Sequence, residues 1–371
     1  MPDVIVIGAG PVGLLLSAEL QRLGVDVHLL EQRPTPGPGS RAIGIHPPAL
    51  SAMEPSGLTE QLLQHALRVR TGEARAAGRL LGTVQFDALK RRFPFVATLP
   101  QETTETVLSA AAPPPQRGTP VQQLLPRDEH VSIRTDAGER TAPLVVLTGG
   151  ARSRSLVYSQ PQAHQYPDRY LMVDAEAGDG PDEAAAVIHL ESHGVLESFP
   201  LPGGRRRFVA WDAPGSSAEP AAQSERMAQL LSGHRAAADP EQVRAFGVRR
   251  FVAPRMRNGR LLVIGDAAHE VSPIGGQGMN LGLLDAAALA PLLARWTHTG
   301  ASPDADLRAW EQDRLSSARR AAALASLNTR LGRRASPPVQ LARKQLVRTM
   351  LGPGSGRLFA HAYAMGFDAH S

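Results

Sequence analysis

Val4-Ile5-Val6-Ile7-Gly8-Ala9-Gly10-Pro11-Val12-Gly13 is the stretch of sequence that decides the fold. Its first four residues form a continuous apolar run of β-branched residues, which is typical of a parallel strand buried on both faces. After the glycine-rich turn, residues 14–23 predict a helix that ends at Gly24, and residues 25–30 predict a second strand. This order of strand, turn, helix and strand indicates a βαβ unit that binds a dinucleotide.

Each glycine of the turn has a predicted task. Gly8 permits the tight turn, Gly10 lets the backbone approach a pyrophosphate, and Gly13 lets the helix pack closely on the strand. Glu31 ends the second strand, 18 residues after Gly13, where a carboxylate can accept hydrogen bonds from a ribose diol. The predicted ligands of the nucleotide half are Gly8, Gly10, Pro11, Val12, Gly13, Glu31, Gln32 and Arg33.

A second glycine-rich stretch lies about 250 residues further along the chain. Leu261-Leu262-Val263-Ile264 predicts another buried strand, and Gly265-Asp266 follows at its carboxyl end, where open α/β sheets bind ligands. A helix is predicted to begin near Gln277–Gly278, and its N–H groups suit a flavin, whose N1/C2 edge gains negative charge on reduction. The alternative is a buried aspartate that caps its own loop. The predicted flavin-half residues are Gly265, Asp266, Gly278, Met279 and Asn280, with Pro273, Gly275 and Gly276 as a catalytic flavin-edge loop.

Composition excludes several classes of protein. The chain has 371 residues, of which 42% are hydrophobic and 20% charged, as in a soluble globular protein. It lacks an apolar run of about 18 residues and a basic leader, so we expect a cytoplasmic location. It has no cysteine, so redox chemistry needs an added cofactor, and no metal site is predicted. The net charge of +5 does not indicate nucleic-acid binding, and either a monomer or a homodimer is compatible with it.

The two glycine-rich stretches, together with residues between them, resemble a known family. The chain is similar to the FAD-dependent monooxygenases of the para-hydroxybenzoate hydroxylase type, most nearly the ubiquinone-biosynthesis hydroxylase branch. The matching segments are 41–46, 99–108 and 359–366. The resemblance implies that Arg41 reaches the FAD pyrophosphate, Gln101 the ribityl chain and Asp266 the ribityl O3′, with Val121 contacting adenine through its backbone.

Two histidines are candidates for catalysis. His46 could reach the active site from the segment that begins at Arg41, and His269 invites a general-acid role. A histidine that only packs its own loop is the alternative for both residues.

The sequence departs from the family pattern at Gly149. Relatives carry Gly-Ala-Asp-Gly-Ala-Arg-Ser, whose aspartate serves FAD and NADPH, whereas this chain has Gly149 at the aspartate position and keeps Arg152 and Ser153. Glycine has no side chain to accept a hydrogen bond, and a lost charge-assisted bond costs about 1.5–3 kcal/mol. Gly149 remains a predicted FAD contact, and reduction by NADPH or NADH is the step that the departure affects.

The predicted fold is α/β, with a Rossmann-like FAD domain of the glutathione-reductase type, an inserted antiparallel-sheet substrate domain and a C-terminal helical extension. Short strands and a turn at residues 202–204 indicate the antiparallel sheet. The predicted boundaries are 1–75, 100–160 and 252–330 for the FAD domain, 76–99 and 161–251 for the substrate domain, and 331–371 for the extension.

The leading functional hypothesis is an FAD monooxygenase that uses O₂ and NAD(P)H. As the resemblance implies, it would hydroxylate or epoxidise a hydrophobic polyketide, terpenoid or quinone-like molecule of secondary metabolism through a flavin C4a-hydroperoxide. The alternatives are an FAD-dependent reductase or other non-oxygenating flavoenzyme, and a flavin-binding protein without NADPH-driven turnover. After Asp313 the chain has ten basic residues and one acid, so this segment either is a solvated face or docks on a carrier protein or anionic membrane.

Overall fold

The computed structural model describes residues 1–37, 42–88, 91–176, 184–234, 239, 242–352 and 365. Arg41 lies outside the described residues, and so does the segment 359–366 apart from Met365. The roles that the resemblance implies for these residues stay predictions.

A five-stranded sheet begins with the predicted βαβ unit. Its strand order is β17-β18-β11-β1-β2, in which β1, β2, β11 and β18 are parallel and β17 is antiparallel to β18. All four residues of β1 are buried because the sheet is covered on both faces. Gly24 ends the first helix with φ +78, a left-handed conformation that favours glycine. The elements are β1 (Val4–Ile7), α1 (Pro11–Arg22), β2 (Val27–Leu30), β11 (Leu144–Leu147), β17 (Arg257–Asn258) and β18 (Leu261–Val263).

An eight-stranded sheet forms the second large layer, in the order β19-β16-β12-β15-β14-β13-β5-β6. The predicted hairpin turn is present at residues 202–204, and every ladder is antiparallel except β13 with β5. The predicted boundary after residue 75 falls inside β5, and the domain boundaries stay predictions. The strands are β5 (Thr71–Ala76), β6 (Arg79–Gln85), β12 (His164–Glu176), β13 (Ala185–Glu191), β14 (Gly194–Leu201), β15 (Arg205–Asp212), β16 (Arg244–Val252) and β19 (His269–Glu270).

Two three-stranded sheets and a set of helices complete the described fold. The small sheets have the orders β3-β7-β4 and β10-β9-β8. Their strands are β3 (Gly44–Ile45), β4 (Leu67–Val69), β7 (Val96–Thr98), β8 (Val121–Pro126), β9 (Val131–Thr135) and β10 (Gly138–Ala142). The further helices are α2 (Pro47–Met53), η1 (Glu54–Ser56), α3 (Leu58–Leu63), α4 (Gln101–Ala111), η2 (Ala151–Leu156), α5 (Pro220–Leu231), η4 (Gly265–Ala267), α6 (Gly278–Thr299), α7 (Asp304–Leu331) and α8 (Pro337–Met350).

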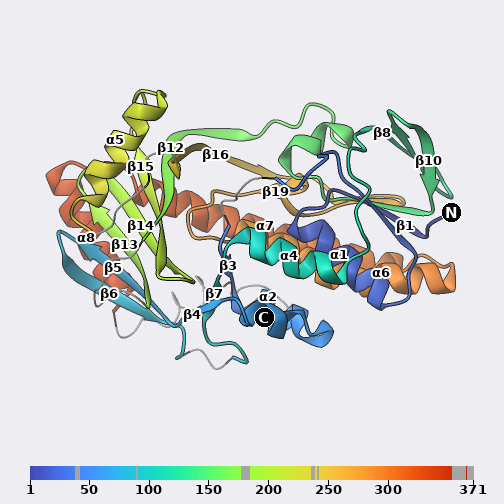
Figure 1. Ribbon diagram of the computed structural model, residues 1–371, viewed down its shortest axis with the longest axis horizontal. Coiled ribbons are helices and arrows are strands. Elements are labelled where there is room, and N and C mark those ends of the chain that lie inside the picture. The colour runs from blue at the N-terminus through green and yellow to red at the C-terminus, as the bar shows by residue number, and fades with distance from the viewer. Residues whose placement is uncertain are drawn as a thin grey trace.

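Helix α7 contacts both the region of the five-stranded sheet and the eight-stranded sheet. In Figure 1 the eight-stranded sheet is at the left with α5 and α8, whereas α1, α4 and α6 run across the centre and right. The 28 residues of α7 span about 42 Å. Near one end Glu311 accepts the N–H of Arg257 at 2.9 Å, and near the other Ser326 Oγ lies 2.5 Å from Tyr166 Oη. This helix therefore braces the region between the sheets.

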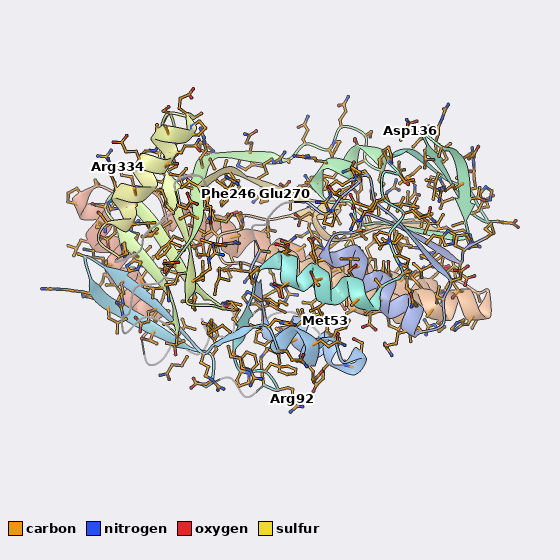
Figure 2. All side chains as sticks on the ribbon, viewed as in Figure 1. Met53, Arg92, Asp136, Phe246, Glu270 and Arg334 are labelled. Atoms are coloured by element: carbon orange, nitrogen blue, oxygen red, sulfur yellow. The ribbon has the colours of Figure 1, made fainter. Side chains whose placement is uncertain are left out.

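The charged side chains labelled in Figure 2 lie both at the edge and near the middle of the molecule. Figure 2 shows Arg92, Asp136 and Arg334 near the outline and Phe246 and Glu270 closer to the middle. Within the described ranges, no helix combines the length and the apolar character that crossing a bilayer requires.

Candidate functional site

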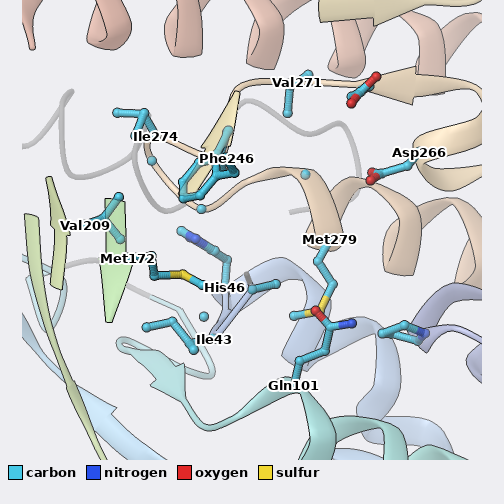
Figure 3. A pocket seen from close by; sticks show the side chains of 18 of the residues that line it. Ile43, His46, Gln101, Met172, Val209, Phe246, Asp266, Val271, Ile274 and Met279 are labelled. Atoms are coloured by element: carbon cyan, nitrogen blue, oxygen red, sulfur yellow. The ribbon is translucent and has the colours of Figure 1, made fainter. Parts of the chain in front are cut away.

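A cavity of about 900 Å³ lies between the five-stranded and the eight-stranded sheets and is lined by residues of both. Figure 3 shows Met172 and Val209 at one end, Asp266 and Met279 toward the other, and His46 between them. The cavity thus has a nucleotide half beside α1 and an apolar half against the large sheet. Of the predicted cofactor and catalytic residues, those on its wall are Gly8, Gly10, Pro11, Val12, Glu31, Gln32, Arg33, His46, Gln101, Val121, Gly149, Asp266, Pro273, Gly275, Gly276, Gly278 and Met279.

The glycine-rich turn packs tightly on one side and is open on the other. A Cβ on Gly8 would lie 2.7 Å from Gly149 Cα, and Gly8 has φ +114. A Cβ on Gly13 would overlap the Gly8 carbonyl oxygen and lie 2.5 Å from Thr148 Oγ1. In contrast, a Cβ on Gly10 would meet no atom within 4 Å, since this residue faces the cavity. The turn therefore leaves a backbone cradle at the N-terminus of α1.

Glu31 is held as a carboxylate at the edge of this cradle. It is 4% exposed, and its Oε2 accepts the N–H of Ala9 at 2.8 Å. Its Oε1 accepts the N–H of Arg33 at 2.9 Å and Arg33 Nε at 3.1 Å. Burial by itself raises the pKa of Glu31, but the hydrogen bonds from Arg33 and Ala9 outweigh it and lower the pKa overall. The carboxylate is therefore ionised at neutral pH.

Asp266 marks the other end of the nucleotide half. It lies in η4 directly after β18 and faces the cavity. The buried Arg154 donates from Nη2 to the Asp266 carbonyl at 2.7 Å and pairs through Nη1 with Glu270 at 2.8 Å. The backbone that carries Asp266 is thus fixed by a cation that is itself paired.

Asn280 and His46 join two walls of the cavity. Asn280 is fully buried behind the wall, where its Oδ1 accepts the N–H of His46 at 2.8 Å. Its Nδ2 donates to the carbonyl oxygens of Gly44 at 2.9 Å and Gly276 at 3.1 Å. His46 Nε2 lies 3.6 Å from the position of a Cβ on Gly276, so the histidine meets the predicted flavin-edge loop. Gly13, Gly265 and Asn280 support the wall from behind and do not line it.

A buried ionic cluster lies beneath the Gly265-Asp266 turn. Asp285 is fully buried, its Oδ2 is 2.6 Å from His269 Nε2, and its Oδ1 accepts Arg314 Nε at 2.8 Å. Burial by itself raises the pKa of Asp285, but His269 and Arg314 lower it overall. Sequence reasoning missed this cluster, although one acid inside the apolar run Leu281–Ala286 was an available signal. His269 packs on α6 and is fully buried, behind the cavity wall.

The second half of the cavity is mainly apolar. One face of the eight-stranded sheet supplies its floor, because side chains on a strand alternate between two faces. Helices α7 and α8 close it. The apolar residues that line this half include Val84, Phe86, Met172, Ile188, Leu190, Val195, Phe199, Val209, Phe246, Ile274, Leu331, Val347, Met350 and Leu351. Such a wall suits a hydrophobic molecule with several rings or a long carbon skeleton.

The described residues hold no group of three or more His, Cys, Asp or Glu side chains that could bind a metal ion. The features that line the cavity are a backbone cradle, carboxylates such as Glu31 and Asp266, and an apolar wall.

Comparison with known proteins gives the cavity a context. A family model described as FAD binding domain matches residues 1–325. The 6-methylpretetramide 4-monooxygenase of Streptomyces rimosus is 31% identical over 315 residues, which are 79% of this chain and 56% of that protein. The chain spans 56% to 61% of the length of three such curated relatives.

Solved structures share the whole architecture. The p-nitrophenol 4-monooxygenase of Pseudomonas putida DLL-E4 has a TM-score of 0.88 and 23% identity, and the match covers 98% of both chains. An aromatic hydroxylase from angucycline biosynthesis has a TM-score of 0.78 and 27% identity over 99% of this chain and 76% of that chain. The predicted fold class is therefore confirmed.

Proposed function

Because this chain belongs to the FAD binding domain family, we propose that it is a flavin-dependent monooxygenase that hydroxylates a hydrophobic aromatic molecule, such as a polyketide of secondary metabolism. The observation that carries the proposal is the continuity of the cavity, which leads from the backbone cradle of α1 to the apolar face of the large sheet. An isoalloxazine at the junction would lie beside an apolar substrate. Similarity to an anhydrotetracycline 6-monooxygenase and to a para-nitrophenol 4-monooxygenase supports the proposal.

The residues of the nucleotide half fit FAD. The open position at Gly10 and the free N–H groups of the first turn of α1 suit a pyrophosphate. The ionised Glu31 suits a ribose diol, and Asp266 with the N-terminus of α6 suits the flavin end. FAD, when bound, would supply the redox chemistry and the activation of O₂.

The chain's own contribution is to hold the substrate and exclude water. Met172, Val209 and Phe246 present an apolar face to the cavity, and Asn280 fixes the His46 segment to the loop at Gly276. Direct hydrogen bonding of His46 to a reacting group, the use of NADPH or NADH, and epoxidation in place of hydroxylation remain part of the proposal.

The test is turnover of the FAD-loaded protein with NADPH or NADH and polycyclic phenols. We expect substrate-dependent consumption of reductant and O₂ in step with a product that is one oxygen atom heavier, as measured by an oxygen electrode and mass spectrometry. A parallel anaerobic reaction is the control, because product formed without O₂ would favour the reductase alternative. Absence of any oxygenated product across phenols, quinones and polyenes would refute the proposal.

A second candidate is a flavoprotein that NAD(P)H does not reduce directly. The observation that favours it is Gly149, which lines the cavity without a side chain to accept a hydrogen bond. Stopped-flow absorbance decides between the candidates: reduction by dithionite but not by NADPH or NADH supports the second, and reduction by either nucleotide rejects it.

The basic C-terminal segment is a proposed docking surface for a carrier protein or an anionic membrane. However, Gln340 and Arg343 of α8 donate to the carbonyl oxygens of Leu190 and Glu191 at 2.8 and 2.7 Å, so α8 is also part of the cavity wall. Removing α8 would therefore change substrate binding through the loss of cavity wall, whether or not the segment docks on a partner. Neutralising the exposed Arg334 and Arg348 leaves the wall intact, and a raised KM for carrier-bound but not free substrate would support docking. A cytoplasmic location belongs to the same proposal.

A further inference from the structure

Glu197 is a buried acid in the apolar half of the cavity. It lies on β14, is 3% exposed and lines the cavity. Other acids on the wall have partners: Glu31 has Arg33, Glu73 has Arg75, and Glu270 has Arg154. No hydrogen bond or ion pair to the Glu197 side chain is found among the residues that the structure describes.

The nearest neighbours of Glu197 on the strands are apolar, and the Tyr170 hydroxyl is a polar group that interacts with it electrostatically. Val195 and Phe199 precede and follow it on the same face of β14, and Ile188 and Val209 stand opposite it on the neighbouring strands. Arg207 lies on this face too, but its Nε and Nη2 donate to the Asp174 carboxylate at 2.6 and 2.7 Å. The cation that comes nearest along β15 is therefore already paired.

Burial makes this carboxyl group a hydrogen-bond donor at neutral pH. It raises the pKa of Glu197 to about 8, so the group carries a proton near pH 7. A buried O–H group costs free energy unless it finds an acceptor. No hydrogen bond to Glu197 is formed within the described part of the chain, and because Glu197 lines the cavity, a molecule bound there can supply the acceptor.

We infer that Glu197 donates a hydrogen bond to a neutral oxygen substituent of the substrate, a ring carbonyl or hydroxyl, and so selects oxygenated aromatic molecules over hydrocarbons of the same shape. Glu197 lies in the cavity that the proposed function assigns to the substrate, so its role rests on that function. A binding measurement that needs no turnover tests the role of Glu197 independently of the proposed monooxygenase activity.

The other titratable groups around Glu197 do not explain a loss of hydrogen-bond donation to the substrate near pH 8. On β12, burial raises the pKa of Tyr170 far above its usual range, and Asp168 pairs at 2.7 Å with Arg333, which follows the end of α7. On β15 and β12, Arg207 and Asp174 form the pair described above. Two strands away in the same sheet, Glu73 of β5 pairs with Arg75 at 2.6 Å. Helix α8 adds Lys344 and Arg343, which donates to the backbone carbonyls of Leu331 and Glu191 and to the Gln340 side chain.

The test compares 1-tetralone with tetralin, which differ only in the ring carbonyl and do not ionise. Binding to the FAD-loaded protein is followed by the change in flavin absorbance between pH 6.5 and pH 9.5. We expect the wild type to bind 1-tetralone about tenfold more tightly than tetralin at pH 6.5. The preference should fall as pH rises past about 8, because the carboxylate cannot donate.

Variants separate the hydrogen bond from packing. Glu197→Gln keeps shape and a donor, so its preference for 1-tetralone should persist at every pH, whereas Glu197→Leu should bind both probes alike. Glu191→Gln is the matched control on β13, where Glu191 accepts the N–H of Ala77 at 3.0 Å outside the cavity, and it should behave as the wild type. A wild type without preference, or a leucine variant that keeps it, would overturn the assignment. Should Glu197→Leu fail to fold, the pH-independence of Glu197→Gln decides.

Discussion

The backbone N–H of Gly265 donates to Asp285 Oδ2 at 3.0 Å, which ties the turn that carries Asp266 to the first half of α6. The same carboxylate contacts His269 and Arg314, so one buried acid joins the turn, the strand β19 and helix α7. A carboxylate that accepts hydrogen bonds from three chain segments restricts their relative positions. The flavin end of the cavity is therefore positioned by a cluster that lies behind its wall.

Asp285→Asn should strongly destabilise the protein. Arg314 and Asp285 are both fully buried, and removing the charge of Asp285 breaks their ion pair, which costs about 3–5 kcal/mol. Urea unfolding of the FAD-free protein measures this loss. Asp306→Asn is the matched control, because the Arg295–Asp306 pair is about half exposed and should change the free energy of unfolding by less than about 1 kcal/mol. Equal effects of the two variants would contradict a special role for the buried cluster.

The stabilisation by Asp285 should depend on pH in the acid range. Burial raises the pKa of Asp285, but His269 and Arg314 lower it by a larger amount. The pKa of Asp285 in the folded protein is therefore below its pKa in the unfolded chain. Because the pKa is lower in the folded protein, ionised Asp285 stabilises the fold at any pH above its unfolded pKa of about 4. This stabilisation is lost as the pH falls toward the folded pKa of about 2. The difference in unfolding free energy between wild type and Asp285→Asn should thus narrow from pH 5 to pH 2.5. If the difference in unfolding free energy stays constant over this pH range, the charge of Asp285 is not the cause of the stabilisation.

Two glycines of the same turn should respond differently to alanine. A Cβ on Gly13 overlaps the Gly8 carbonyl oxygen, so Gly13→Ala should destabilise the FAD-free protein by about 1–3 kcal/mol. Gly10 has φ −83 and ψ 179, which alanine adopts easily, and its Cβ would meet open space. Gly10→Ala should leave stability within about 0.5 kcal/mol and raise the Kd for FAD roughly tenfold. Thermal unfolding and flavin titration measure the two effects, and a Gly10→Ala variant that binds FAD normally would remove the cradle from the proposed site.

Local patterns predicted the parts of the fold whose physics is local. The run Val4–Ile7 and the glycines after it encode a buried strand and a tight turn, and both were correctly predicted, as was the resemblance to FAD-dependent monooxygenases. The first helix begins at Pro11 and not at residue 14, because proline suits the first helical position, where its missing N–H is not needed. The nearer similarity to the ubiquinone-biosynthesis branch stays a prediction.

Long-range contacts could not be predicted from such patterns. The parallel pairing of β5 with β13 joins residues more than 100 positions apart, and no local signal specifies it. The same holds for Asp285 with Arg314, which meet only when α6 packs on α7. The position of Glu197 could not be predicted either, because an acid in a strand with alternating polar and apolar residues normally faces solvent. Glu197 lines the cavity only because other parts of the chain cover this face of the sheet.

Gly149 and Ser153 should be coupled in the reduction of the flavin. An aspartate at position 149 would bring its Cβ to 2.9 Å from Ser153 Oγ and 3.0 Å from Ser153 Cβ, and Ser153 Oγ already donates to the Gly150 carbonyl at 2.8 Å. The family pattern has this serine together with the aspartate, so Gly149→Asp alone requires the Ser153 side chain to shift and should raise the rate of reduction by NADPH only slightly. Gly149→Asp with Ser153→Gly removes the obstruction, and the restored charge-assisted bond should raise the reduction rate by roughly tenfold or more. Ser153→Gly alone is the control, and stopped-flow absorbance under anaerobic conditions measures all four proteins. Additive effects of the two substitutions would mean that Ser153 does not compete for the aspartate position.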